Sequence, residues 1–298
     1  KKRNGVSSHA LQDSVRGSFR YLVSNSDAAE NTNSGNDWFR SFDSDGFTVS
    51  KTTTGGTATT EWNNSGDTYA SWNWKINGGS TSNVSAGASS NIRLIGGGTA
   101  DQAAVQANTE AGISIVTFET TARGSSTFCT FPHGLNSAPE MVWLKSRDSS
   151  NYWAIYHASV GLKLGFLGSS LGANAFITST FWNAVSSSTV KFQSNGNISA
   201  SGENIIAHCF HSVDGYSKFG SYESNNSTNG PFVFTGFKPA FILMKDADRS
   251  SMTWTMFDNK RGPINPNDES LAANSDAAEP YDSNSDIDFL SNGFKLRG

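Results

Sequence analysis

An acidic tetrapeptide, Asp43-Ser44-Asp45-Gly46, has the oxygen donors and the glycine with which calcium-binding loops begin. An EF-hand also needs a further acidic ligand and flanking helices, and the following residues supply neither. The same Phe-x-Ser-Asp/Asn-Gly frame returns at 192–196 and 289–293, where the carboxylates are lost and the glycine is kept. We therefore predict a tight hairpin turn with a positive φ at the glycine.

Two Asp–Arg pairs have the same spacing and are each followed by a glycine. Asp13 precedes Arg16 by three positions, and Asp258 precedes Arg261 in the same way. Such a pair can bind an anion or a saccharide, or it can brace a turn. The recurrence of the spacing favours the brace, because structural ion pairs outnumber functional ones.

The remaining titratable residues form no recognisable catalytic or metal-binding motif. His208 and His211 are three positions apart, which places them on opposite faces of a strand and argues against a shared metal ion. The candidates for the two carboxylates of a glycoside hydrolase lie in no known motif and are Glu140, Asp148, Glu203, Asp214 and Glu223. We therefore assign no catalytic residue and expect no metal and no cofactor.

Three tryptophans are the candidates for ligand binding. Trp38, Trp62 and Trp182 lie in loop-like surroundings, where an indole can stack on a sugar ring. Trp153 and Trp254 instead occupy equivalent places in a repeat, so we expect them in the core.

An internal repeat organises these residues. Residues 25–30 and 274–279 are identical, and further matches define a unit of roughly a hundred residues, the size of one small domain. Only the middle unit is whole, so we expect the chain to be an excerpt of a longer polypeptide. The predicted organisation is repeat 1 at 1–79, a Gly/Ser/Ala-rich linker or insertion at 80–111, repeat 2 at 112–214 and repeat 3 at 215–298.

Composition predicts an all-β protein. Charged residues make up only 16% of the chain and aromatic residues 12%, while Ser, Thr, Asn and Gly are abundant. This mixture disfavours long helices and favours short strands separated by turns. We expect tandem antiparallel β-sandwich repeats, jelly-roll or lectin-like. The predicted strands are 69–74, 113–118, 141–145, 153–157, 205–210, 241–245 and 254–257.

Two segments depart from this pattern. Residues 101–111 are alanine-rich and predict a short helix within the linker. Residues 27–30 could form a helical turn capped by Ser26 or Asp27. The two cysteines, Cys129 and Cys209, cannot make a disulfide framework, and Cys209 is expected as a buried free thiol.

Charge and hydropathy argue against two classes of partner, nucleic acids and membranes. The net charge is −4 and no basic cluster exceeds the first three residues, so we expect no nucleic acid partner. No apolar run approaches the ~20 residues of a membrane helix, so we expect no membrane insertion.

Several of these frames resemble a known family. Residues 13–17, 25–30, 42–49 and 66–75 are similar to a repeated domain of unknown function found in tail-fibre-like and other virion structural proteins of marine bacteriophages, as are 215–222 and 230–241. The resemblance covers the chain except residues 80–108. Family members usually carry a cysteine where Asn73 stands, and the middle repeat keeps it as Cys209.

The resemblance implies a non-enzymatic component of the virion surface. We expect a tail-fibre-like protein that adheres to a glycan or protein of the host surface, contacts other virion proteins and forms a homotrimer. The first alternative is a purely structural part of the capsid surface or fibre shaft. The second is a polysaccharide-degrading tailspike module.

Overall fold

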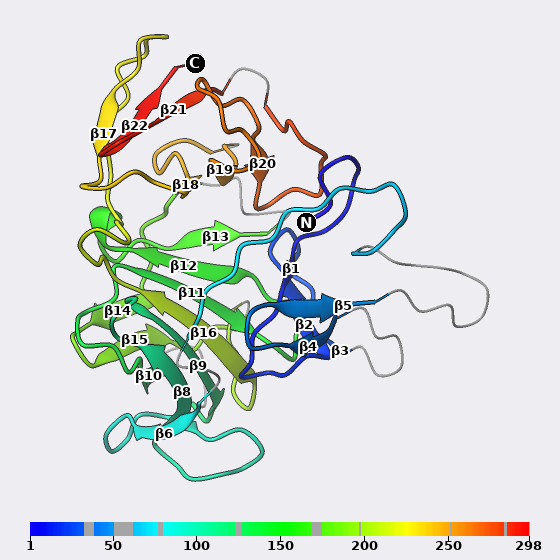
Figure 1. Cartoon of the computed structure of the whole chain (residues 1–298). Coiled ribbons are helices and arrows are strands. Elements are labelled where there is room, and N and C mark those ends of the chain that lie inside the picture. Colours follow the sequence, from blue (N-terminus) through cyan, green and yellow to red (C-terminus); the bar gives the residue numbers. More distant parts are fainter. Residues whose placement is uncertain are drawn as a thin grey trace.

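The computed structural model describes residues 1–32, 39–50, 62–76, 80–122, 127–168, 175–196, 198–250, 252–282 and 285–297. These residues form 22 strands and one short 3-10 helix at Ala158–Val160 (Figure 1). All their strand pairings are antiparallel. The all-β prediction is confirmed. In the described part of the chain no helix is long and apolar enough to cross a membrane.

The largest sheet lies in the middle of the chain and has eight strands. Its order is β13-β12-β11-β16-β9-β8-β6, with β7 also paired to β9. The strands are β6 (Ser82–Ser85), β7 (Ile92–Arg93), β8 (Gln102–Asn108), β9 (Ile113–Thr120), β11 (Met141–Ser146), β12 (Trp153–His157), β13 (Gly165–Leu167) and β16 (Asn204–Phe210).

The helix predicted at 101–111 is wrong, because most of this segment is strand β8. Ala103 and Val105 alternate into the core, and β8 pairs with β9 over five positions from Ala104 to Asn108. Pairing with a buried neighbour overrides the helical preference of alanine. The expected linker thus contributes three strands to the sheet.

A second sheet covers one face of the large one. It has the order β10-β15-β14, with β10 (Phe128–Pro132), β14 (Trp182–Val185) and β15 (Thr189–Gln193). Between the two sheets Phe131 stacks on Phe118 with ring centres 5.1 Å apart. Cys129 and Cys209 are both buried in this core as free thiols, and burial raises the pKa of each to about 12.

The C-terminal part has the same two kinds of sheet on a smaller scale. One contains β18 (Phe241–Met244), β19 (Thr255–Asp258) and β20 (Leu271–Ala272), and the other contains β17 (Phe232–Phe234), β21 (Ile287–Leu290) and β22 (Gly293–Leu296). Ile242, Phe257, Phe289 and Phe294 fill the core that they share.

The N-terminal part contributes a three-stranded sheet and a hairpin. The strands are β1 (Ala10–Leu11), β2 (Arg20–Val23) and β3 (Asn31–Thr32), followed by the hairpin of β4 (Phe39–Phe42) and β5 (Phe47–Val49).

Local predictions in this N-terminal part have mixed outcomes. Residues 69–74 form no strand, but Tyr69 makes a β-bridge with Lys2. The segment 27–30 is not helical, and Ser26 Oγ accepts the backbone N–H of Ala28 at 3.1 Å.

The Asp-Ser-Asp-Gly segment is a turn, as predicted. Asp43 donates its backbone N–H to the carbonyl of Gly46 at 2.9 Å between β4 and β5. The predicted positive φ is wrong for Gly46, Gly196 and Gly293 alike. At Gly293 the reason for glycine is space, because an added Cβ would lie 2.1 Å from the carbonyl oxygen of Val233.

A central core joins the three parts of the chain. Leu22 of β2, Leu167 of β13 and Leu271 of β20 belong to one buried cluster, together with Trp153 and Trp254. The two tryptophans expected in the core are thus buried. Residues far apart in the sequence therefore pack against one another in this core.

Candidate binding site

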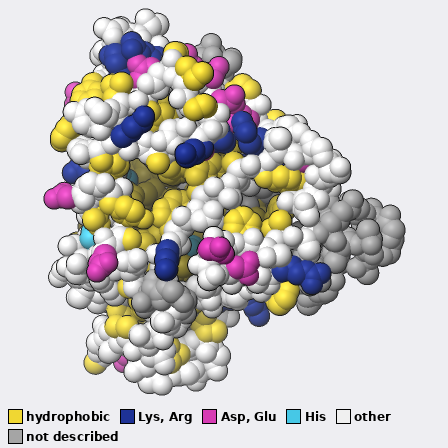
Figure 2. Space-filling model, in the orientation of Figure 1, with side chains coloured by type: hydrophobic (Ala, Val, Ile, Leu, Met, Phe, Trp, Pro, Cys, Tyr) yellow, Lys and Arg dark blue, Asp and Glu magenta, His cyan; other side chains and the backbone are white. Residues whose placement is uncertain are grey.

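A cavity of about 270 Å³ opens between the end of β19 and strand β21. Its lining is almost entirely polar and combines two lysines with two asparagines. The residues are Lys238, Asn259, Lys260, Gly262, Pro263, Asn265 and Phe289. Figure 2 shows lysine and arginine side chains spread over this upper part of the molecule, above a hollow lined by apolar side chains.

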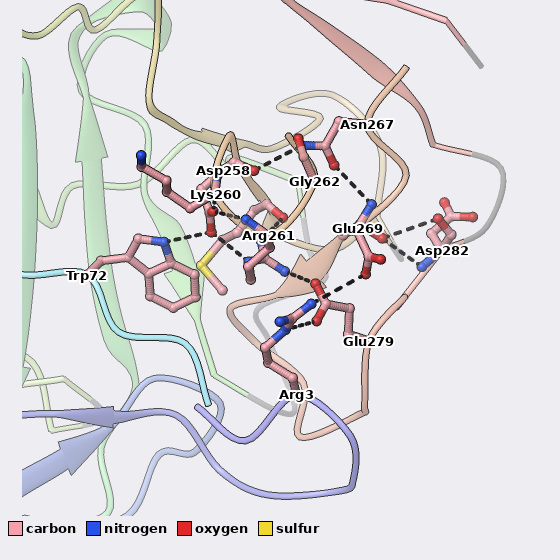
Figure 3. Close-up of polar contacts among 12 residues, drawn as sticks. Arg3, Trp72, Asp258, Lys260, Arg261, Gly262, Asn267, Glu269, Glu279 and Asp282 are labelled. Carbon is pink, nitrogen blue, oxygen red and sulfur yellow. Dashed lines mark hydrogen bonds and ion pairs between the residues drawn. The ribbon is translucent and has the colours of Figure 1, made fainter. Parts of the chain in front are cut away.

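The turn that carries Lys260 is held by the carboxylate of Asp258. This carboxylate accepts the backbone N–H groups of Lys260 and Arg261 at 3.0 and 2.9 Å, and Nε of Arg261 at 2.6 Å. The indole N–H of Trp72 donates to it from another part of the chain at 3.1 Å. Figure 3 shows the Lys260 side chain directed away from this network.

Asn267 also holds the loop that lines the cavity. Its side-chain amide donates to the carbonyl groups of Asp258 and Gly262 at 2.9 and 2.8 Å, and its Oδ1 accepts the N–H of Glu269 at 3.0 Å. An added Cβ on Gly262 would lie 2.3 Å from Asn267 Oδ1. The hydrogen bonds of Asn267 therefore hold the loop in place. The Asn267 side chain leaves room only for a glycine at position 262.

Glu279 connects this loop to the N-terminal part of the chain. Its buried carboxylate binds the guanidinium groups of Arg261 and Arg3 (Figure 3). Burial raises the pKa of Asp258. The hydrogen bonds and charge of Arg261 lower it by a larger amount, so the pKa lies below its ordinary value. Burial and the neighbouring Glu279 raise the pKa of Glu269.

Two cationic groups of the cavity remain available to a ligand. Lys238 and Lys260 are exposed, and neither forms an ion pair within the residues that the structure describes. The Asn265 side chain is already bonded to the backbone of Phe289 at 3.0 and 2.9 Å. Two ammonium groups at one polar cavity suit an anionic group, such as a carboxylate, sulfate or phosphate.

A matching network lies near the start of the chain. Asp13 accepts the backbone N–H of Arg16 at 2.9 Å and pairs with its guanidinium. Glu30 binds Arg16 at 3.1 Å and Arg147 at 3.0 and 2.9 Å. His208 Nε2 lies 3.9 Å from Asp13, as Trp72 lies beside Asp258. Both Asp–Arg pairs brace turns, as their spacing predicted.

The tryptophan candidates are not gathered at this cavity. Trp38 lies outside the described residues. Trp62 is half-buried, with its ring edge-on to Tyr21 at 5.1 Å. Trp182 is only 2% exposed and donates its indole N–H to the carbonyl of Ile155 at 3.2 Å, so its ring is in the core.

The lysines were missed by sequence reasoning. The one available signal is a difference between two similar sequence segments, because Lys260 of segment 258–262 stands where segment 13–17 has Val15. Lys238 has no comparable signal in the sequence.

Three of the five candidate carboxylates of a hydrolase anchor neighbouring groups. Glu140 accepts the backbone N–H of Ser212. Asp148 accepts the backbone and side-chain N–H groups of Asn204 at 2.6 and 3.1 Å. Glu203 accepts the side-chain amide of Asn151 at 3.2 and 3.0 Å.

The histidines differ in their surroundings. The His208 side chain is 12% exposed, and its partial burial lowers its pKa to about 4, with Asp13 raising it and Arg16 lowering it further. Burial also lowers the pKa of His9, to about 3. Across the described ranges no three His, Cys, Asp or Glu side chains are grouped as metal ligands.

Comparison with known proteins places the chain by family. No curated protein and no solved structure shows significant similarity to it. One family model, described as a domain of unknown function (DUF7483), matches residues 1–298. The chain therefore belongs to the DUF7483 family.

Proposed function

We propose that this chain is a non-enzymatic surface protein of a marine bacteriophage virion, tail-fibre-like, that adheres to the host surface. The observation that carries the proposal is a pair of exposed lysines, Lys238 and Lys260, that have no ion-pair partner among the described residues. They line a cavity whose loop is held by hydrogen bonds from Asn267. Its ligand is an acidic group of a host glycan or protein. Other virion proteins are its partners within the particle.

The proposed architecture is three related units of about a hundred residues, each made of two packed sheets. Three corresponding side chains support this arrangement, because each donates to a carbonyl group of a neighbouring part. Trp153 donates to Val23 at 3.1 Å and Trp254 donates to Phe166 at 2.8 Å. His9 Nε2 lies 3.0 Å from the carbonyl oxygen of Ser275.

The three units meet at three junctions. At two of them an arginine of one unit binds a glutamate of the next, an ion pair that we call the clasp. Arg147 binds Glu30 and Arg3 binds Glu279. In each case the glutamate also donates its backbone N–H to the carbonyl of the arginine, at 2.8 and 2.9 Å. At the third junction Ala247 stands at the place of the arginine and accepts the backbone N–H of Phe176 at 2.9 Å.

Buried ion pairs and short hairpins suit a part of a virion surface, because they fix loops on a rigid scaffold. A homotrimer, which the resemblance implies, belongs to this proposal. Light scattering on the purified chain tests it, and a monomer at micromolar concentration would contradict that element.

Binding to immobilised acidic and neutral glycans, and to whole marine bacterial cells, tests the function. We expect the Lys238→Ala/Lys260→Ala double variant to bind acidic ligands at least tenfold more weakly, and wild-type binding to fall as salt is raised. Lys75→Ala, at another exposed lysine, is the matched control. Adhesion through this cavity is excluded if binding is absent or unchanged in the double variant.

A further inference from the structure

We propose, as an extension that rests on the proposed adhesion function, that the cavity at Lys238 and Lys260 holds one sugar residue bearing a carboxylate, such as a uronate. Both lysines are exposed, and the cavity that they line has a volume of about 270 Å³. This volume lies below the roughly 300–1,000 Å³ of pockets that enclose drug-sized ligands. It suits a single sugar ring rather than several.

The two lysines are not needed by the strands that they flank. β18 and β19 pair in the same register as β11 and β12, since in each case the first residue of one strand lies opposite the last residue of the next. In that register Ala138 stands in the place of Lys238, and Ser159 stands in the place of Lys260. The same pair of strands thus forms without either charge, which points to a role of the lysines in binding.

The backbone of the cavity loop, residues 259–263, offers a ligand no N–H group. Each N–H group in this stretch already has an acceptor, which is the carboxylate or carbonyl of Asp258 for Lys260, Arg261 and Gly262 and the carbonyl of Ala240 for Asn259. Pro263 has no N–H group. The donors that this loop presents to a ligand are therefore side chains.

This shortage of donors favours a carboxylate over a phosphate or sulfate. Tetrahedral oxyanions are held most firmly by several N–H donors or by the fork of a guanidinium group. The nearby guanidinium of Arg261 is already paired with Asp258 and Glu279. Two ammonium groups without such help match the two oxygens of a carboxylate.

The rest of the lining suits a hydroxylated ring. Asn259 donates its side-chain amide to the carbonyl of Pro239 at 3.4 Å, and its Oδ1 accepts no hydrogen bond from the described residues. A sugar hydroxyl can donate to this oxygen. Phe289 and Pro263 add apolar surface, on which the face of a pyranose can pack. A sugar acid uses all three kinds of contact, whereas acetate uses only the charge.

Titration of the intact chain with glucuronate, followed by amide chemical shifts in NMR spectra, tests the ligand class. We expect saturable shifts within residues 259–263. Glucose lacks the carboxylate and acetate lacks the ring, so each should bind about tenfold more weakly or worse, as should inorganic sulfate and phosphate. Digalacturonate should bind less than about threefold more tightly than galacturonate, because its second ring lies outside the cavity.

Substitutions separate the charge from the hydroxyl contact. Lys238→Ala and Lys260→Ala should each weaken glucuronate binding by about fivefold or more, and Lys75→Ala, at an exposed lysine elsewhere, should leave it unchanged. Asn259→Ala should weaken glucuronate binding by about threefold and leave acetate binding unchanged, because acetate has no hydroxyl. The amide spectrum of each variant shows whether it is folded.

The outcomes distinguish this ligand from the adhesion function itself. Binding of glucose, acetate, sulfate or phosphate that equals that of glucuronate would overturn the sugar acid. Polygalacturonate that binds, is lost in the Lys238→Ala/Lys260→Ala double variant and is not displaced by glucuronate would retain the adhesion site and overturn the single sugar residue. If no acidic ligand bound the wild-type chain, both proposals would fall.

Discussion

Arg147 and Glu30 are joined by two hydrogen bonds of 3.0 and 2.9 Å, although 117 positions separate them in the sequence. Glu30 also binds Arg16 and Arg20, so one carboxylate on a side chain that is 3% exposed forms ion pairs with three guanidinium groups. This contact joins the first part of the chain to the end of β11. Glu30 ends one of the two identical hexapeptides, 25–30 and 274–279, but its partner Arg147 is fixed only by the fold.

Glu30→Gln should lower the free energy of unfolding by about 3–5 kcal/mol, because it leaves buried guanidinium charge without its partner. Urea denaturation followed by intrinsic fluorescence measures this change. Glu110→Gln, at an exposed glutamate, is the matched control and should change stability by less than about 0.5 kcal/mol. Equal effects of the two substitutions would contradict the role of the clasp.

Acid should weaken the same clasp. Burial raises the pKa of Glu30, but Arg147 and Arg16 together lower it by a larger amount. Its pKa in the folded protein therefore lies below the ordinary value of 4.5. A carboxyl with a depressed folded pKa stabilises the fold above its unfolded pKa and loses this effect as pH falls through the folded value. The urea concentration at the midpoint of unfolding should therefore decrease as the pH is lowered below about 4.5. Glu30→Gln should show a shallower fall over that range.

His208 should give stability a separate pH dependence. Its folded pKa is lowered from 6.5 to about 4, mainly by burial, so the unfolded chain binds a proton between these values and the folded chain does not. Stability is then lost as pH falls from 6.5 towards 4, at up to about 1.4 kcal/mol per pH unit. His208→Gln should reduce this slope, with pH 8 as the reference at which the ring is neutral in both states. An unchanged slope would contradict the prediction.

Two glycines of one sequence frame should respond differently to alanine. Gly293→Ala places a Cβ 2.1 Å from the carbonyl oxygen of Val233 and should cost about 1–3 kcal/mol of stability. Gly46→Ala has open space within 4 Å and no positive φ, so it should change stability by less than about 0.5 kcal/mol. Thermal unfolding compares the two, and similar losses would refute the distinction.

The Asp43 turn should not respond to calcium. Its two carboxylate oxygens already accept the hydroxyls of Ser41 and Thr48, at 2.7 and 2.8 Å. Millimolar calcium should leave the melting temperature unchanged, and so should a chelator. Asp43→Ala should lower the melting temperature slightly through the lost hydrogen bonds. A saturable calcium-induced rise in melting temperature that Asp43→Ala removes would show a metal site instead.

The strands that sequence alone predicted best are those with clear alternation and buried neighbours. β9, β11, β12 and β16 were predicted to within two residues at each end, because every second side chain of each enters a core. The alanines of β8 do not distinguish the two-residue repeat of a strand from the 3.6-residue repeat of a helix, and this is why the sequence predicts a helix there. Only its pairing with β9, which is non-local, determines its conformation.

The site was less predictable than the fold. The recurring Asp–Arg spacing indicated a brace around Asp258, and the brace is there. No local pattern predicts that Trp72 binds Asp258 or that Arg3 binds Glu279, because these contacts cross 186 and 276 positions. The cavity beside Lys260 depends on the same long-range contacts, and no spacing rule reaches that far.

The junction at which Ala247 stands in place of the arginine has a consequence for the response to salt. Trp254 and Phe176 meet there with ring centres 6.1 Å apart, next to Ala247. Apolar contacts of this kind strengthen when excluded salts such as sulfate are added, whereas ion pairs weaken by screening, and buried ones weaken least. Rising ionic strength thus acts in opposite directions on the two kinds of junction. The association of the three parts should change little with salinity.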